Sequence, residues 1–164
     1  MDFFECVCKR ASVRSYRDQP IDKEMLVRLI DIARRAPTAR AQEPWEFVII
    51  TDKSVLKKIG SIAENGKFIE DAATGIVIFC RSTKYYLEDG CAATQNVLLA
   101  AADAGLGACW IAGDKKDYAA EIGILLKAPA GLKLVSIISL GWSLNEVSQS
   151  KKRQTEQLMH WDSF

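Results

Sequence analysis

The sequence predicts an α+β domain in which helices flank a central mixed β-sheet. Three observations lead to this class. Two stretches with helical periodicity precede the first strand, four short apolar runs have the length of buried strands, and helical stretches separate those runs irregularly. A chain of 164 residues is large enough to bury a real core, so residues 1–164 are expected to form a single domain.

Aspartates open three of the predicted helices, because an Asp side chain can accept a hydrogen bond from the unpaired backbone N–H groups of a first turn. These are Asp2 for residues 2–10, Asp22 for residues 23–36 and Asp52 for residues 52–64. Pro37 stops the second helix, since its ring and missing N–H disfavour continuation. The pair Asn65-Gly66 is typical of a helix end and is expected to stop the third.

The four apolar runs predict strands over residues 45–50, 75–80, 108–112 and 134–140. The longest helix, over 87–104, is apolar on nearly all sides, which predicts burial, in part against another subunit. A surface helix is expected over 114–126. From residue 143 the chain turns polar and loses periodicity, apart from one turn around 156–161. We therefore expect 143–164 to form an extended C-terminal arm that wraps a partner subunit.

The overall composition excludes several functional classes. There are 22 basic and 21 acidic residues, a net charge of +1, which gives no support for nucleic-acid binding. No apolar run approaches the roughly 20 residues that cross a bilayer, and the N-terminus lacks the pattern of a signal peptide. The five cysteines suit unpaired thiols in a reducing cytoplasm, where we expect the protein. Cys6-Val7-Cys8 lacks zinc-site spacing, so no metal is expected.

Two basic clusters lie near the two ends of this nearly neutral chain. The first is Arg10-Ala11-Ser12-Val13-Arg14, directly after the first helix, and the second is Lys151-Lys152-Arg153. Arginine and serine side chains at a helix end, met by further cations, suit a bound phosphate. The alternative is that both clusters are solvated surface, since cations at a helix C-terminus are common for dipole reasons alone.

The order and spacing of these clusters, with the irregular segment 36–45 between them, resemble the nitroreductase family of FMN-dependent oxidoreductases over about residues 2–161. By this resemblance, Arg10 and Ser12, with Ala11 between them, contact the phosphate or ribityl chain of FMN. Arg14 points to the N1/O2 edge of the isoalloxazine, where a cation stabilises the negative charge that reduction creates. Lys151 and Arg153 match the family's C-terminal K-x-R, which closes on the same phosphate.

The segment Pro37-Thr38-Ala39-Arg40-Ala41-Gln42-Glu43-Pro44-Trp45 resembles the family's P-S-A-x-N-x-Q-P-W loop, which reaches the flavin from the other subunit. The resemblance implies that FMN contacts are made by Pro37, Thr38, Ala39 and Ala41. Two positions depart from the pattern, because Ala41 stands where Asn is usual and Glu43 where Gln is usual. Ala41 removes an amide without a replacement, and Glu43 replaces an amide by a carboxyl group that can carry a charge.

Three more positions have two interpretations each. Asn65 falls where larger members carry an Asn at the flavin's pyrimidine edge, but it also suits a helix end. Gly107 and Ala108 fall where the family's backbone approaches flavin N5, but Gly105-Leu106-Gly107 also suits helix termination. This glycine run leads from helix into strand, the wrong order for a dinucleotide-binding fingerprint.

The resemblance implies a homodimer with FMN at the interface. It also implies ping-pong transfer of a hydride from NADH or NADPH to a small oxidised acceptor such as a nitroaromatic, quinone or enone. No side chain need act as a catalytic nucleophile, because the flavin carries the chemistry. The alternatives are a flavin-binding module with little turnover and a specialised member such as a reductive dehalogenase. Such specialised members usually carry a substrate lid, for which this chain has little room.

Overall fold

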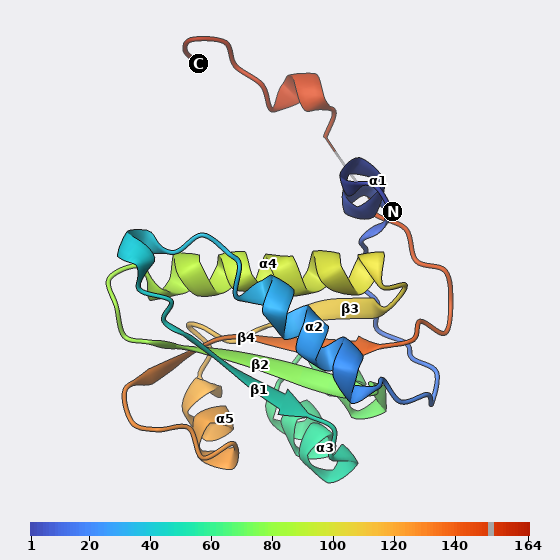
Figure 1. The fold of residues 1–164 in the computed structure, drawn as a ribbon, viewed down its shortest axis with the longest axis vertical. Helices are drawn as coiled ribbons and strands as arrows, with labels where there is room; N and C mark the ends of the chain where they lie inside the picture. Colours follow the sequence, from blue (N-terminus) through green and yellow to red (C-terminus); the bar gives the residue numbers. More distant parts are fainter. Residues whose placement is uncertain (151–152) are drawn as a thin grey trace.

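A computed structural model describes residues 1–150 and 153–164, and its centre is a four-stranded sheet in the order β1-β2-β4-β3 (Figure 1). The strands are β1 Trp45–Ile50, β2 Thr74–Arg81, β3 Gly107–Ala112 and β4 Leu132–Gly141. The predicted α+β class is confirmed. All three strand pairings are antiparallel, whereas the sequence predicted a mixed sheet. Strand direction was not readable because each connection holds a helix and is long enough for either direction.

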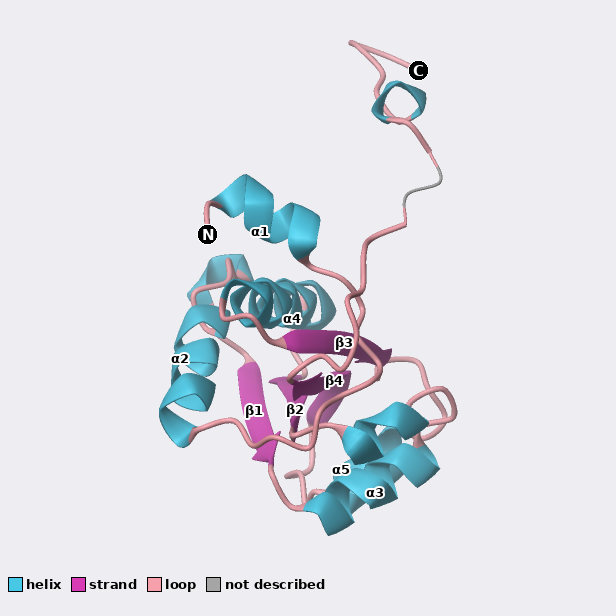
Figure 2. Cartoon of the chain, turned by 90° about the vertical axis from the view of Figure 1, so that its right-hand side faces the viewer, coloured by secondary structure: helices cyan, strands magenta, loops and turns pink. Residues whose placement is uncertain are grey.

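Helices cover both faces of the sheet. They are α1 Phe3–Lys9, α2 Lys23–Ala33, α3 Lys53–Ile62, α4 Tyr86–Asp103 and α5 Ala119–Leu125, with short 3-10 turns η1 Ala39–Ala41, η2 Lys67–Asp71 and η3 Thr155–Gln157. Helices α2 and α4 lie on one face, and α3 and α5 lie on the other (Figure 2). Helix α1 lies beyond α4, near its C-terminal end.

The three predicted aspartate caps are confirmed. The Oδ1 atoms accept from Glu5 N at 2.9 Å for Asp2, from Met25 N at 2.7 Å for Asp22 and from Ser54 N at 2.7 Å for Asp52. Each bond satisfies one of the N–H groups that a first turn leaves without a partner. The sequence therefore predicted the starts of α1, α2 and α3 correctly.

The core has two layers, one on each side of the sheet. Strand β2 is buried from Thr74 to Cys80, and its side chains alternate between the layers. Ile76 and Ile78 face α2 and α4, whereas Val77 and Phe79 face α3 and α5. This alternation follows from the period of two in a strand. The continuous apolar run therefore predicted a strand covered on both faces.

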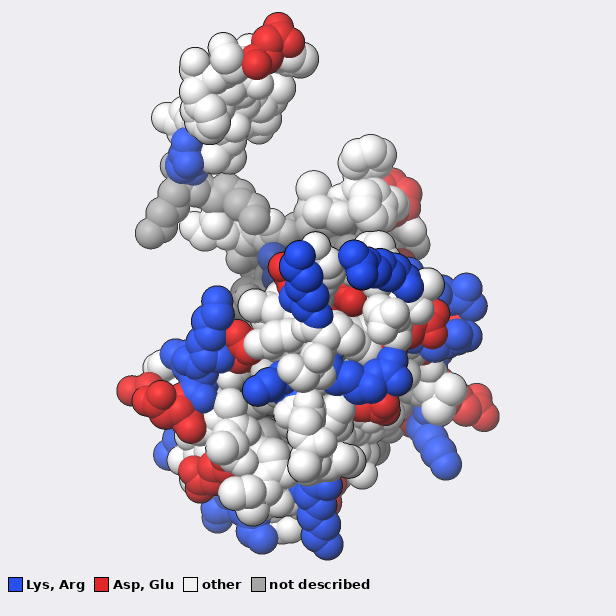
Figure 3. All heavy atoms as spheres, turned by 90° about the vertical axis from the view of Figure 1, so that its left-hand side faces the viewer, with Lys and Arg blue, Asp and Glu red and all other residues white. Residues whose placement is uncertain are grey.

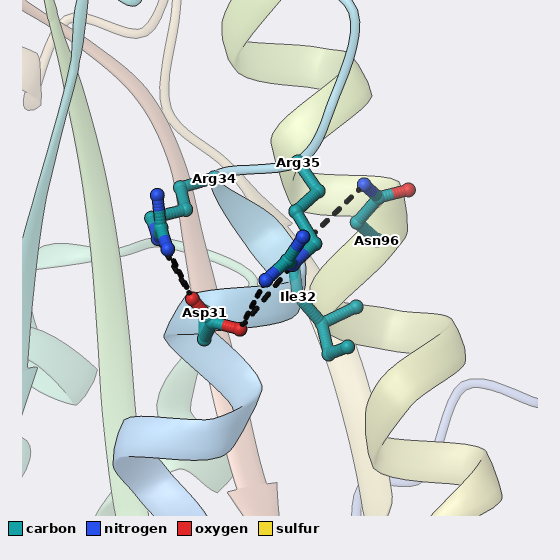
Figure 4. A network of polar contacts seen from close by, with 5 residues as sticks. All are labelled: Asp31, Ile32, Arg34, Arg35 and Asn96. Atoms are coloured by element: carbon teal, nitrogen blue, oxygen red, sulfur yellow. Dashed lines mark hydrogen bonds and ion pairs between the residues drawn. The ribbon is translucent and has the colours of Figure 1, made fainter.

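Helix α4 is buried largely within its own subunit, between the sheet, α2 and α1. The C-terminal turn of α2 is attached to it by Asn96, whose Nδ2 donates to Ile32 O at 3.3 Å (Figure 4). Beside this contact, Asp31 pairs with Arg34 at 2.5 Å and with Arg35 at 3.1 Å. These ion pairs are solvent-exposed, so they contribute little to stability.

Several predicted boundaries differ from the structure. Helix α2 ends at Ala33, three residues before the predicted end at Ala36. The surface helix begins at Ala119 rather than 114, because Lys115 has φ 60° and interrupts a right-handed helix. Helix α3 ends at Ala63, before Asn65-Gly66. Gly66 serves packing instead, since a Cβ there would lie 2.9 Å from Ala63 Cβ. The C-terminal turn was expected around 156–161, and η3 occupies Thr155–Gln157.

Candidate functional site

The Arg10–Arg14 cluster crosses the end of the sheet next to β3. Helix α1 ends at Arg10, where the backbone leaves the helical region with φ −56° and ψ 120°. Val13 N then donates to Ala108 O at 3.0 Å, and Ser12 forms a parallel bridge with Ala108. Gln149 holds the turn, because its Nε2 donates to Arg10 O at 2.6 Å. The backbone of the cluster is thus fixed by strand-like contacts to β3.

A groove of about 890 Å³ opens along this crossing, within the usual range of small-molecule sites. Three parts of the chain line it: the cluster, the start of β3 and the segment after β4. Its lining includes Arg10, Ala11, Arg17, Gly107, Ala108 and residues 142–148. The structure therefore brings together four predicted site residues: Arg10, Ala11, Gly107 and Ala108.

Arg14 lines a second hollow, of about 550 Å³, together with Lys53, Glu70 and Asp71. Its guanidinium carbon lies 5.7 Å from the centre of the Phe68 ring, a cation–π distance. Leu144 lines both the groove and the hollow, so the two spaces adjoin. The cluster thus presents Arg10 and Arg14 to neighbouring but different spaces.

The local electrostatics of the cluster are positive. Burial raises the pKa of the Cys109 thiol, which is 2% exposed in β3, and the charges of Arg14 and Arg10 partly offset that rise. Two arginine side chains therefore act on the same point at the sheet end, where a neutral thiol carries no charge to balance them. The groove and the hollow also carry carboxylates, Glu146 in the groove and Asp18, Glu70 and Asp71 in the hollow, so the positive charge is confined to the cluster itself.

Gly107 allows the cluster to approach the sheet. A Cβ at this position would lie only 2.7 Å from Val13 Cγ1 and 2.8 Å from Val13 Cβ. Helix termination belongs instead to Gly105, which has φ 74° and precedes a backbone bond from Leu106 N to Ala101 O of 2.8 Å. Gly107 therefore does not end the helix. It makes room for Val13, a contact that neither of the two sequence interpretations included.

The loop of residues 37–43 lies at the opposite end of α4. Thr38 Oγ1 donates to Asp89 Oδ2 at 2.9 Å, and Ala39 N donates to Asp89 Oδ1 at 3.0 Å. Asp89 is in the first turn of α4, whereas the groove adjoins its last turn. The 18 residues of α4 correspond to about 27 Å. Within one chain, Pro37, Thr38, Ala39 and Ala41 therefore do not meet the groove.

The remaining predicted residues also lie outside the groove. Ser12 belongs to the cluster but lines neither the groove nor the hollow. Asn65 is exposed between α3 and η2 and lines neither space. Arg153 is exposed in the C-terminal arm, where its Nη2 donates to Gln157 O. Residues 153–164 stand apart from the body of the subunit (Figures 1 and 2). Lys151 lies outside the described residues.

Sequence reasoning missed two features, one that lines the groove and one that holds the loop 37–43. Residues 142–148 follow the buried strand β4, and loops after buried strands often carry function. Asp89 sits on the buried stripe of α4, four residues before Ala93 and eight before Val97. The sequence signal that could have identified Asp89 is an acidic residue on the apolar stripe of a helix, since a buried carboxylate needs hydrogen-bonding partners.

Three further observations concern surface charge, metal-binding side chains and membrane-spanning helices. On the face shown in Figure 3, basic and acidic side chains are interspersed, in keeping with the small net charge. Within residues 1–150 and 153–164, no group of three His, Cys, Asp or Glu side chains could hold a metal ion. None of the helices in these residues is long and apolar enough to cross a membrane.

Comparison with known proteins agrees with this geometry. The Nitroreductase family model matches residues 7–89 and 66–142. A relative from Methanothermobacter thermautotrophicus, provisionally named NADH dehydrogenase/NAD(P)H nitroreductase, is 31% identical over 87% of this chain and 78% of its own. A Bacteroides thetaiotaomicron protein with the same provisional name superposes with TM-score 0.93 and 26% identity over 98% of this chain and 97% of its own. An FMN-dependent nitroreductase from Clostridium difficile also gives 0.93, with 28% identity over 99% and 100%.

Proposed function

The chain belongs to the nitroreductase family, and from this membership we propose how this NAD(P)H-dependent flavin oxidoreductase holds its FMN. We place FMN in the groove beside the Arg10–Arg14 cluster, with its phosphate toward Arg10 and Ser12 and its ring toward Arg14. The observation that carries this placement is the convergence of Arg10, Gly107 and Ala108 on one groove. Bound FMN accepts and donates the hydride, so the protein's tasks are binding, orientation and electrostatics.

The residues present fit such a ligand. Arg10 and Arg17 supply cations to the groove, and cations are the usual partners of a phosphate. The adjoining hollow carries Arg14 and Lys53, but Asp18, Glu70 and Asp71 line it as well, so the positive charge for a reduced ring would come from Arg14 itself and not from the hollow as a whole. Leu144 lies between the two spaces and offers an apolar surface for a flat ring.

The loop 37–43 supports a homodimer. It resembles a cofactor-contacting segment, yet its contact on α4, Asp89, lies 9 and 13 residues before Leu98 and Ala102 of the groove of its own chain, about 14 and 20 Å along the helix. In a two-fold dimer the loop of one subunit can complete the groove of the other. A second feature agrees with this arrangement: Phe3 and Phe4 on α1 are 67% and 80% exposed, and large exposed apolar side chains mark interaction surfaces. We place the C-terminal arm, with exposed Trp161, along the partner.

The reaction we propose has a ping-pong order. NADH or NADPH would bind beside the bound flavin ring, transfer a hydride to it and leave, and a small oxidised acceptor would then enter the same space and take up the hydride together with a proton. The acceptor is a nitroaromatic, quinone or enone. Arg14 favours the first half-reaction, because a fixed cation at the ring edge stabilises charge that develops there.

The visible spectrum of the purified protein tests the placement of FMN. Flavin bands should be present, or should be restored by added FMN, and denaturation should release FMN. Arg10→Ala should weaken binding about tenfold or more, because a charge-assisted hydrogen bond is lost. Protein that stays colourless and binds no added FMN would contradict the proposal.

Light scattering tests the assembly. A dimer is expected both with and without FMN, since the apolar faces of α1 and the arm are present in either state. A stable monomer that carries flavin would show that the groove is complete in one chain, and the dimeric site would then be wrong.

A further inference from the structure

The carboxylate of Asp89 is a charged group on the buried face of α4, where the other buried side chains are apolar except for Thr94. Its side chain is in the first turn of α4, and the residue is 5% exposed. Both of its oxygens accept bonds from the loop 37–43: Oδ2 from Thr38 Oγ1 at 2.9 Å and Oδ1 from Ala39 N at 3.0 Å. A buried carboxylate is retained against its desolvation penalty only where it has such partners.

Thr38 extends this hydrogen-bond network from Asp89 to the end of the loop. Its Oγ1 donates to Asp89 and accepts from Glu43 N at 3.1 Å. The hydroxyl proton can be used only once, so Asp89 fixes the direction of the hydroxyl and leaves its lone pair for Glu43 N. The start and the end of the loop are thereby joined through one oxygen atom.

The loop between these bonds has a backbone that isolated residues rarely adopt. Arg40, Ala41 and Glu43 have φ values of 57°, 52° and 42°. Residues with a Cβ disfavour this left-handed region, and they persist there only where surrounding contacts impose it. The contacts with Asp89 impose it at the start of the loop.

Arg81 holds the end of the same loop. Its Nη2 donates to Gln42 O at 2.6 Å and to Glu43 O at 3.0 Å, and its backbone N donates to Pro44 O at 2.8 Å. Arg81 is the last residue of β2, and Asp89 belongs to the helix that follows it. An anion and a cation from adjoining elements thus clamp one strained segment at its two ends.

We propose that Asp89, acting through Thr38, is a positioning residue that sets the loop 37–43 in the conformation that meets the partner subunit's FMN. This inference rests on the proposed function, because it assigns the loop to the second half of a shared site. Asp89 itself touches no ligand in this arrangement. Its effect is to keep three residues in a conformation that they would otherwise leave.

Asp89→Asn tests the proposal by replacing one carboxylate oxygen of Asp89 by an NH2 group. The amide keeps an oxygen for Ala39 N but replaces the second oxygen by a donor, which faces the donating hydroxyl of Thr38. FMN titration of the full-length protein, followed by flavin fluorescence, should show a dissociation constant raised about tenfold, as expected when a bond to a charged group is lost. The circular dichroism of the bound flavin should also change. Glu88→Gln changes an exposed neighbour on the same helix that has no hydrogen bond to the loop within the described residues, and it should alter neither.

Thr38 variants show whether the effect passes through the hydroxyl. Thr38→Ser keeps the bond to Asp89 and should bind FMN nearly as the parent does, whereas Thr38→Val should raise the dissociation constant about tenfold. In the Thr38→Val background, Asp89→Asn should add less than about twofold, because the pair is already broken. If Asp89→Asn does not fold, Thr38→Val decides, and unchanged FMN binding there overturns the proposal.

Three other results would count against it. Wild-type affinity in folded Asp89→Asn would overturn the positioning role and leave the proposed function intact. Full additivity of the two substitutions would show that Asp89 acts independently of Thr38, which also overturns it. Failure of the unaltered protein to bind FMN would contradict the proposed function itself and this inference with it.

Discussion

A single methyl group at Gly107 should disturb both the packing of the sheet end and the binding of FMN. In Gly107→Ala, the new Cβ would lie 2.7, 2.8 and 2.9 Å from Cγ1, Cβ and Cγ2 of Val13. Rotation about χ1 does not relieve this clash, because Val13 is branched at Cβ and its Cβ is itself too close. The backbone of one or both segments has to move. Overpacking of this kind costs about 1–3 kcal/mol.

The assay is urea unfolding together with FMN titration. Gly107→Ala should lower the free energy of unfolding by about 1–3 kcal/mol and weaken FMN binding, because the Arg10–Arg14 cluster is displaced from β3. The control is Gly123→Ala in α5, where a Cβ meets nothing within 4 Å. That variant should be neutral or up to about 1 kcal/mol more stable, since Ala is the better helix former.

The double variant Gly107→Ala with Val13→Ala tests whether the loss of stability comes from the clash with Val13. Removing the Val13 γ-methyl groups eliminates two of the three close contacts, so the double variant should be more stable than the sum of the single effects predicts. Strict additivity would refute the steric argument. An unchanged FMN affinity in Gly107→Ala would refute the claim that this crossing positions the cluster.

The remaining predictions concern charge, protonation and a helix cap. Arg14→Ala should lower the flavin midpoint potential while costing little affinity, whereas Arg153→Ala should weaken FMN binding and leave the potential unchanged; a redox titration of both distinguishes these roles. Burial raises the pKa of Tyr16, whose hydroxyl bonds to Ser139 Oγ at 2.6 Å. Below about pH 10 both states keep this proton, and above it only the native state does, so stability should fall by up to about 1.4 kcal/mol per pH unit. Tyr16→Phe removes that contribution, and its urea midpoint should fall less steeply between about pH 10 and 11. Asp22→Ala should cost about 0.5–2 kcal/mol of unfolding free energy by loss of the α2 cap.

Local features of the fold were predictable from the sequence because their causes are local. The Asp22 cap depends on residues within one turn, and β1 was predicted with the bounds Trp45–Ile50 that the structure has. Where the cause is distant, the prediction was wrong. Gly66 suited a helix terminator, but the position is required for a close contact with β3, since a Cβ there would lie 3.0 Å from Ile111 Cγ2.

The sequence predicted individual residues of the candidate site but not how the segments that carry them lie relative to one another. Arg10 and Ala108 could be assigned to one site only through the resemblance to nitroreductases, because no local pattern says that the two lie together. That Val13 bonds to Ala108, and that residues 142–148 complete the groove, depends on which strand ends lie together. Strand order is set by the whole core, so no local pattern states it.

The position of Thr38 relative to Arg10 has a thermodynamic consequence. The two segments are close in the sequence, yet α4 keeps them at its opposite ends. A folded monomer therefore contains both halves of the proposed site without containing the site. If FMN contacts both halves, it binds the dimer more tightly than the monomer, and linkage requires that FMN then stabilise the dimer by the same factor. The rigidity of the loop contributes to this coupling, because a loop already held by Asp89 and Arg81 loses less entropy when it meets the cofactor.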